Sequence, residues 1–121
     1  KRPLIICSQW GETTVSMHGI ERKFKDIIIY PIGCIEWDWQ KSDTHHVPGI
    51  QKKDIKILLD NGCDKIILTT GYKNVLQIDP ETITWMNNNQ IKYKILNTRD
   101  AILLYNDSHG EKIGMLLHST C

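Results

Sequence analysis

The sequence predicts one α/β domain over residues 1–121, with a mixed, largely parallel core sheet, three helices and an added N-terminal β portion. Short apolar runs that are typical of buried strands, such as Ile66-Ile67-Leu68, alternate with amphipathic helical segments after residue 50. The first 40 residues carry strand patterns instead, and these must join the core sheet or form a further β layer. No repeat, low-complexity tract or linker offers a domain boundary.

The first third of the chain is predicted to be strands. Thr13–Met17 alternates weakly, and Asp26–Tyr30 is a β-branched run that Pro31 stops. Because this run is apolar at successive positions, we expect a strand covered on both faces. Cys34–Trp39 is predicted as another strand.

Two tryptophans, Trp37 and Trp39, stand two positions apart in that last segment. On a strand both side chains would point to one face. They are interpreted either as packing between layers or as an exposed aromatic patch for a partner.

The middle of the chain changes character. The polar stretch from Gln40 to Gly49 is predicted as a loop, followed by a helix that ends at Asn61-Gly62. Lys65–Thr69 is then predicted as a buried strand, which Gly71 ends. The helix has an apolar stripe of Ile55, Leu58 and Leu59 and a solvated face of Lys52, Lys53, Lys56 and Asp60.

The last third repeats the alternation of helix and strand. Asp79-Pro80-Glu81 is a helix start, since Asp can cap, Pro suits the first turn and Glu favours the positive helix end. That helix is predicted to reach about Asn89 and to precede a strand over 91–96. Thr98 is predicted to cap a third helix, and Lys112–Leu117 to form the last strand.

Composition excludes several classes of partner. With 15 Lys plus Arg against 14 Asp plus Glu, the net charge of +1 argues against nucleic acid as a partner. Apolar runs of three residues are far shorter than the roughly 20 needed for a membrane span, so we expect no membrane partner. The four cysteines show no CxxC spacing and are predicted to be reduced thiols in a metal-free, disulfide-free monomer. Reduced thiols indicate a reducing compartment, and a chain that starts with Lys1 leaves an upstream targeting segment, for example a mitochondrial one, open.

Several motifs together resemble the signature of the Mth-type domain family. The motifs are Glu36-Trp37-Asp38-Trp39, Thr44, His46-Val47-Pro48-Gly49-Ile50-Gln51, Leu96-Asn97-Thr98, Ala101, Tyr105-Asn106 and His118-Ser119-Thr120-Cys121. The resemblance implies a three-layer α/β fold with a central mixed sheet. For the animal branch it implies a cytoplasmic protein linked to fat-cell differentiation and growth control. It supplies no catalytic residue, and the Gly-x-Gly of its relatives is replaced here by Thr69-Thr70-Gly71.

The polar loop holds Asp43 beside His45 and His46. Adjacent histidines rarely aim at one ion, and no further ligand has suitable spacing, so no metal is expected. His46 is interpreted either as a base or ligand contact or as a loop-stabilising hydrogen-bonding group. Thr70-Gly71 follows a buried strand, but a phosphate loop would need a helix directly after it, so a plain turn is expected.

The last residues of the chain include side chains that hydrolases and redox proteins use, namely His118, Ser119 and Cys121. His118 and Ser119 are sequence neighbours at the end of a predicted strand. Their side chains would point to opposite faces of the sheet, so a nucleophile–base pair is not expected. Cys121 is expected to be exposed and open to oxidation.

These arguments lead to one candidate region. The loop over 43–51 and the turn over 69–71 are predicted to border a common cleft, with the positive helix end favouring an anionic group beside His46. The candidate binding residues are Trp39, Asp43, Thr44, His46, Gly49, Gln51, Thr70 and Gly71. The sequence favours a non-enzymatic protein that acts through an unidentified protein partner and has no cofactor. The alternative is a small-molecule-binding protein or enzyme that uses the cleft near His46 and Gly71.

Overall fold

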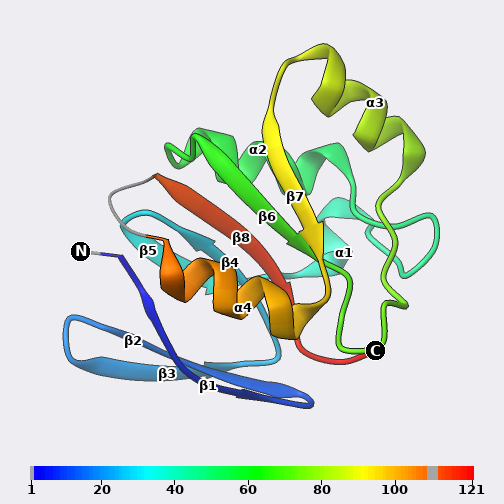
Figure 1. Cartoon of the computed structure of the whole chain (residues 1–121). Coiled ribbons are helices and arrows are strands. Elements are labelled where there is room, and N and C mark those ends of the chain that lie inside the picture. Colours follow the sequence, from blue (N-terminus) through cyan, green and yellow to red (C-terminus); the bar gives the residue numbers. More distant parts are fainter. Residues whose placement is uncertain (1, 109–111) are drawn as a thin grey trace.

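The computed structural model describes residues 2–108 and 112–121 and divides its strands between two sheets (Figure 1). The first sheet has the order β1-β2-β3, with β1 Leu4–Gln9, β2 Glu12–Met17 and β3 Ile20–Phe24. The second has the order β5-β4-β8-β6-β7, with β4 Asp26–Tyr30, β5 Gly33–Glu36, β6 Lys65–Thr69, β7 Lys92–Leu96 and β8 Ile113–His118. The helices are α1 Trp39–Ser42, α2 Lys52–Asp60, α3 Pro80–Asn88 and α4 Thr98–Asp107.

The five-stranded sheet is mixed, as predicted, but parallel pairing does not dominate it. Strand β6 pairs in parallel with β7 and β8, whereas β4 pairs antiparallel with β5 and β8. The difference arises because the hairpin of β4 and β5 joins the core sheet directly. The other N-terminal strands form the separate three-stranded sheet, which is the added β portion that the sequence predicts.

Both faces of the five-stranded sheet are buried at its central strands β4, β8 and β6, as the apolar run in β4 predicts. Ile28 packs on the face that carries α2 and α3, while Ile27 and Ile29 pack on the face that carries α4 and the small sheet. The core of the first face includes Trp37, Ile50, Ile55, Leu58, Ile66, Leu68, Leu76, Met86 and Leu116. The core of the second includes Ile5, Val15, Ile67, Ala101, Tyr105, Met115 and Leu117.

The predicted start of α3 is confirmed, whereas that of α4 shifts by one residue. Asp79 caps α3 by accepting a hydrogen bond from the Glu81 amide at 2.9 Å. In α4 the cap is Asn97. The hydroxyl of Thr98 is buried and donates instead to the His118 carbonyl at 2.6 Å, which ties α4 to the end of β8.

A short fourth helix, α1, occupies part of the expected strand and loop. Strand β5 ends at Glu36, and Asp38 then accepts from the Gln40 amide at 2.9 Å, so it caps α1. The predictions of a strand through Trp39 and of a loop starting at Gln40 are therefore wrong. A local capping carboxylate outweighs the strand preference of the two tryptophans.

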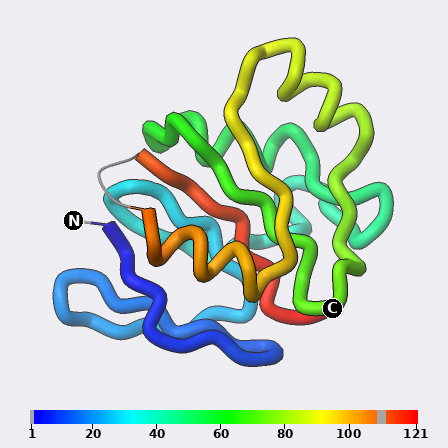
Figure 2. The backbone as a smooth tube through the Cα atoms, in the orientation of Figure 1, coloured from blue at the N-terminus to red at the C-terminus, as the bar shows by residue number. Residues whose placement is uncertain are grey.

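The carboxyl ends of the three parallel strands meet at one edge of the sheet, where the chain also ends (Figure 2). Thr69 and His118 lie at these ends in β6 and β8. Strand β4 runs the opposite way, so it begins at this edge, and its Asp26 is the cross-strand partner of His118. No helix in residues 2–108 and 112–121 is sufficiently long and apolar to span a membrane.

Candidate functional site

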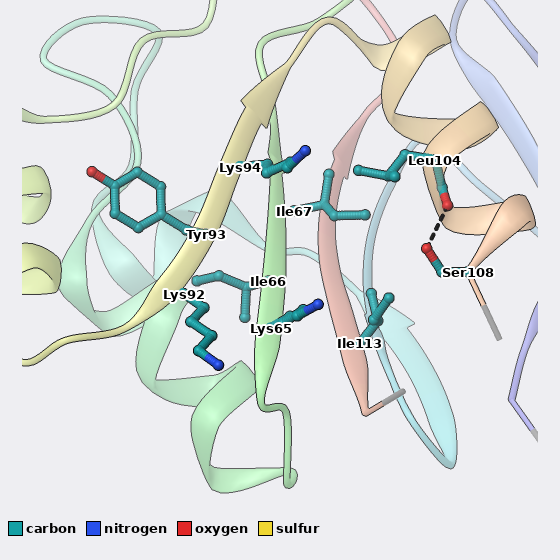
Figure 3. Close-up of a pocket in the computed structure, with 9 residues that line it drawn as sticks. All are labelled: Lys65, Ile66, Ile67, Lys92, Tyr93, Lys94, Leu104, Ser108 and Ile113. Carbon is teal, nitrogen blue, oxygen red and sulfur yellow. Dashed lines mark hydrogen bonds between the residues drawn. The ribbon is translucent and has the colours of Figure 1, made fainter. Parts of the chain in front are cut away.

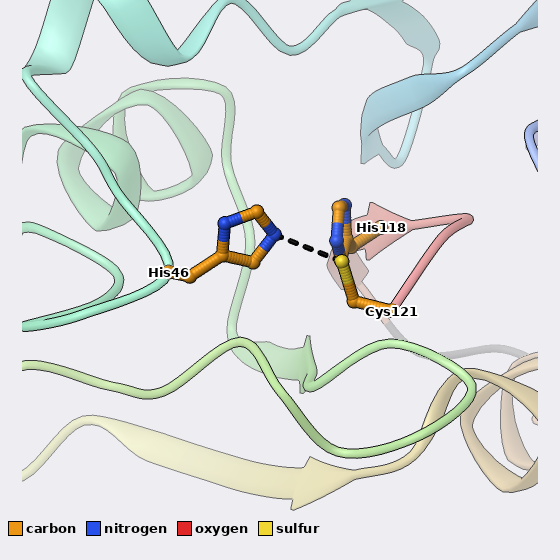
Figure 4. Close-up of side chains that lie close together, drawn as sticks. All are labelled: His46, His118 and Cys121. Atoms are coloured by element: carbon orange, nitrogen blue, oxygen red, sulfur yellow. Dashed lines mark hydrogen bonds between the residues drawn. The ribbon is translucent and has the colours of Figure 1, made fainter.

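Three potential metal ligands converge at this edge of the sheet. One ring nitrogen each of His46 and His118 and the Sγ of Cys121 all lie within 4.8 Å of one another (Figure 4). His118 ends β8, His46 lies in the loop before α2, and Cys121 follows β8 by three residues. The three side chains thus come from two segments, the loop before α2 and the C-terminal segment that begins at the end of β8, and they point toward a shared volume.

Asp26 orients His118. The register of β4 and β8 places the two residues opposite each other, and His118 Nδ1 lies 2.8 Å from Asp26 Oδ1. The His118 side chain is only 2% exposed, so water does not compete for this contact. A carboxylate on Nδ1 favours the tautomer in which Nε2 is unprotonated and can accept a proton or a metal, and the Thr120 hydroxyl lies 3.2 Å from this Nε2.

His46 contacts the thiol directly. Its Nε2 lies 2.9 Å from Cys121 Sγ, and its ring centroid is 5.4 Å from that of His118. Burial lowers the pKa of His46 from its ordinary value near 6.5, and the neighbouring His118 lowers it further. Both effects favour the neutral form of the His46 imidazole, which is the form that accepts a proton or binds a metal.

Trp39 covers both imidazoles. Its ring centroid lies 4.9 Å from that of His46 and 4.8 Å from that of His118. Among the described residues, its buried Nε1 has no hydrogen-bond partner. Trp37 is 3% exposed and packs against Trp39 at 5.5 Å, so the pair forms internal packing and not an exposed patch.

The loop after β6 holds the segment that carries Cys121. The amide of Tyr72 donates to the Thr120 backbone oxygen at 3.3 Å, and the amide of Lys73 donates to that of Cys121 at 2.7 Å. Cys121 is consequently half-buried, and the expectation of an exposed thiol is wrong. Gly71 permits this approach, since its φ is +91° and a Cβ there would lie 2.4 Å from the Thr120 oxygen.

Gly71→Ala is therefore expected to displace the segment of Thr120 and Cys121 and to lower the free energy of unfolding by about 1–3 kcal/mol. Urea denaturation measures the loss. Gly62→Ala is the matched control: its φ is +85°, yet nothing lies within 4 Å of the added Cβ. Equal losses in the two variants would contradict a specific role for the close approach at Gly71.

The residues predicted for the cleft divide into two groups. Trp39 and His46 belong to the cluster, which also contains His118 and Cys121. Gly71 lies against the backbone of Thr120 and Cys121. The hydroxyl of Thr70 donates to Asn74 Oδ1 at 2.6 Å and stabilises the loop. The structure thus brings His46 and Gly71 to the same edge, on either side of Cys121, while ligand binding there stays a prediction.

The other predicted residues have partners outside the cluster. Asp43 pairs at 3.0 Å with the exposed His45, and Thr44 donates at 2.5 Å to the buried Asp54. The Gln51 side-chain amide donates to Asp79 Oδ2 and to the Gly49 carbonyl, both at 3.0 Å. A Cβ at Gly49 would lie 2.2 Å from the Gln77 oxygen. These contacts shape the loop that presents His46.

Sequence reasoning did not select Asp26, His118 or Cys121 as ligands. One signal was available, because His118 and Cys121 are three residues apart, a spacing compatible with a shared ion. Ser119 has no part in the cluster: its Oγ donates to the Lys25 carbonyl, which fits the expected failure of a His118–Ser119 pair. Asp26 gives no signal without the register of β4 and β8.

The cluster could act as a metal site or as a thiol nucleophile with a histidine base. A nucleophile–base pair needs a third group that orients the base. Among the described hydrogen bonds, the carboxylate of Asp26 orients His118, whereas the histidine nearest the thiol is His46. The oriented histidine and the thiol-contacting histidine are thus different residues, which favours metal binding.

The remaining thiols are poor competitors for a metal. Burial raises the pKa of Cys34, and burial together with Asp64 raises that of Cys63 to about 11. A protonated thiol is not a ligand. Cys7 is exposed and lies on the edge strand of the other sheet.

A pocket opens at the other end of β6 and β7, beside α4 (Figure 3). Its lining includes Lys65, Lys92 and Lys94 together with apolar side chains. Figure 3 shows the side chains of Lys92 and Lys94 extending in different directions. This pocket therefore lacks the convergence of polar groups that the His46 cluster has.

Comparison with known proteins gives a family without an assigned activity. A family model described as a protein of unknown function (DUF498/DUF598) matches residues 8–118. The cellular role implied by the Mth-type resemblance receives no support from this match.

Solved structures share the fold. The protein MT938 is 21% identical, with a TM-score of 0.73 and coverage of 98% of this chain and 99% of its own. The conserved hypothetical protein PH1505 from Pyrococcus horikoshii OT3 is 23% identical, with a TM-score of 0.75 and coverage of 97% and 98%. An outer membrane protein from Bartonella henselae is 17% identical, with a TM-score of 0.73 and coverage of 99% and 97%. These likenesses show the fold alone.

Proposed function

The chain belongs to the DUF498/DUF598 family of unknown function, and we propose that it binds a divalent transition-metal ion of the zinc type through His46, His118 and Cys121. The observation that carries the proposal is the convergence of these three ligand atoms within 4.8 Å. Imidazole and thiolate are the ligands that such ions prefer.

The spacing of the ligand atoms supports the proposal. Bonds of about 2.0–2.3 Å in a tetrahedral arrangement separate ligand atoms by roughly 3.4–3.6 Å. His46 Nε2 and Cys121 Sγ are 2.9 Å apart, which is closer than this, and no pair of the three ligand atoms is more than 4.8 Å apart. These two values lie on either side of the tetrahedral separation, and side-chain movements of about 1 Å would bring the atoms to it.

The surroundings of the ligands support it too. Asp26 on His118 Nδ1 is the carboxylate partner that metal-bound histidines commonly have. The ring of Trp39 packs against both imidazoles. Three protein ligands would leave one tetrahedral position for water or a small molecule.

Titration of the reduced protein with Co²⁺ tests the proposal. We expect one equivalent to give a thiolate-to-cobalt charge-transfer band and tetrahedral d–d bands, and Zn²⁺ to displace the cobalt. Binding should weaken as the pH falls, because protons compete for the thiol and the imidazoles. An octahedral spectrum without the charge-transfer band, or no binding at about 100 μM metal, would refute the site.

Action through a protein partner is a second candidate, and the exposed apolar side chains of Ile6, Trp10 and Leu103 favour it. Any part in fat-cell differentiation or growth control in the cytoplasm, as the Mth-type resemblance implies, would be exercised through such a partner.

A further inference from the structure

A groove runs along β1 where it packs beside α4, on the side of the molecule that carries the small sheet. Every residue from Ile5 to Trp10 contributes to its wall. Successive side chains of a strand point to opposite faces, so a groove lined by all of them runs along the edge of β1 and not over one face.

Within residues 2–108 and 112–121, no strand pairs with this edge of β1. In the three-stranded sheet β1 pairs with β2 alone, and the order β1-β2-β3 leaves its other edge free. An edge strand presents a row of backbone N–H and C=O groups that can pair with another extended segment.

Large apolar side chains stand along the same groove. Ile6 is 52% exposed, Trp10 is 56% exposed and Leu103, on α4, is 63% exposed. The ring of Trp10 stacks on Tyr72 at 6.4 Å, which fixes it at the end of the groove.

The charge of the groove has one sign. Lys73 and Arg99 are among the described lining residues, and no Asp or Glu is. Lys73 Nζ lies 5.4 Å from the Trp10 ring centroid, so the cation and the aromatic surface adjoin. The chain as a whole has a net charge of only +1, so the excess of positive charge at the groove is a local feature.

We infer that the groove binds an extended, acidic segment of a partner protein, which adds to β1 as a further strand. Its backbone would pair with the free edge, its apolar side chains would contact Ile6 and Leu103, and its carboxylates would meet Lys73 and Arg99. This inference rests on the partner-binding candidate and is independent of the metal cluster. A lipid would satisfy the apolar contacts and the cations, but it offers no backbone to pair with the strand.

Selection from a displayed library of random linear peptides tests the inference. We expect the enriched peptides to alternate aliphatic and acidic residues and to contain no proline in that stretch. Fluorescence polarisation of one labelled peptide should show at least tenfold weaker binding to Arg99→Glu. Lys94→Glu, an exposed cation on β7, is the matched control and should bind as the unchanged protein does.

Each other outcome overturns the inference. Recovery of basic or proline-rich peptides would leave partner binding standing but refute the acidic strand. Equal binding by Arg99→Glu and Lys94→Glu would move the contact away from the groove. Failure to select any peptide, together with Arg99-dependent binding to phosphatidylserine vesicles, would identify a lipid surface instead.

Discussion

Asp54→Ala is expected to lower the free energy of unfolding by about 3–5 kcal/mol, because the substitution leaves several buried donors without an acceptor. The Asp54 side chain is fully buried in α2. Its oxygens accept from Trp37 Nε1 at 2.9 Å, from the hydroxyls of Ser42 and Thr44 at 2.5 Å each, and from the Gln51 amide at 2.9 Å. This carboxylate therefore joins the residue that follows β5, the segment of α1 and Thr44, and the start of α2.

Asp60→Ala, at the exposed end of the same helix, is the matched control and should change the free energy of unfolding by less than about 0.5 kcal/mol. Urea denaturation followed by circular dichroism measures both variants. If Asp54→Ala does not fold, Asp54→Asn retains one acceptor oxygen and should fold with a smaller loss. A loss for Asp54→Ala no larger than that for Asp60→Ala would show that the network is not stabilising.

Cys121→Ser is expected to weaken Co²⁺ and Zn²⁺ binding at least about 100-fold, or about 2.7 kcal/mol, and to abolish the charge-transfer band. The hydroxyl of serine keeps the size of the side chain but is a poor ligand for these ions. Isothermal titration calorimetry measures the affinity, and the cobalt spectrum reports the ligand.

Cys7→Ser is the control for that variant, since Cys7 is an exposed thiol on β1. It should retain both the affinity and the band. If Cys7→Ser loses the band and Cys121→Ser keeps it, the metal binds elsewhere. Unchanged binding in both variants would remove the thiol from the site.

Local sequence chemistry determined much of the architecture. The β-branched run of β4 predicted a strand buried on both faces, and its alternating side chains do pack into two separate cores. Asp79-Pro80-Glu81 predicted the start of α3 because its capping carboxylate and proline act within one helical turn. Such signals depend on neighbours in the chain and are readable without a tertiary structure.

Other local signals competed with each other. Trp37 and Trp39 suggested a strand, but the Asp38 cap starts α1 between them. Thr98 was the expected cap of α4, yet burial turns its hydroxyl to the His118 carbonyl and leaves the cap to Asn97. In the first case a local cap outweighs a strand preference, and in the second the packing of α4 against the end of β8 gives the Thr98 hydroxyl another acceptor.

The candidate site likewise has one part that the sequence predicted and another that only the tertiary structure shows. Sequence reasoning placed His46 and Gly71 at the carboxyl edge of the parallel strands, because the connectivity of an α/β sheet determines which loops meet there. Only the tertiary structure decided that His118 and Cys121 complete the cluster and that Asp26 orients one ligand. Those contacts join residues 75 and 92 positions apart. The contacts depend on the antiparallel register of β4 with β8 and on the hydrogen bonds that hold the backbone of Thr120 and Cys121. Neither the register nor these hydrogen bonds can be predicted from the neighbouring residues in the sequence, because their partners lie far apart in the chain.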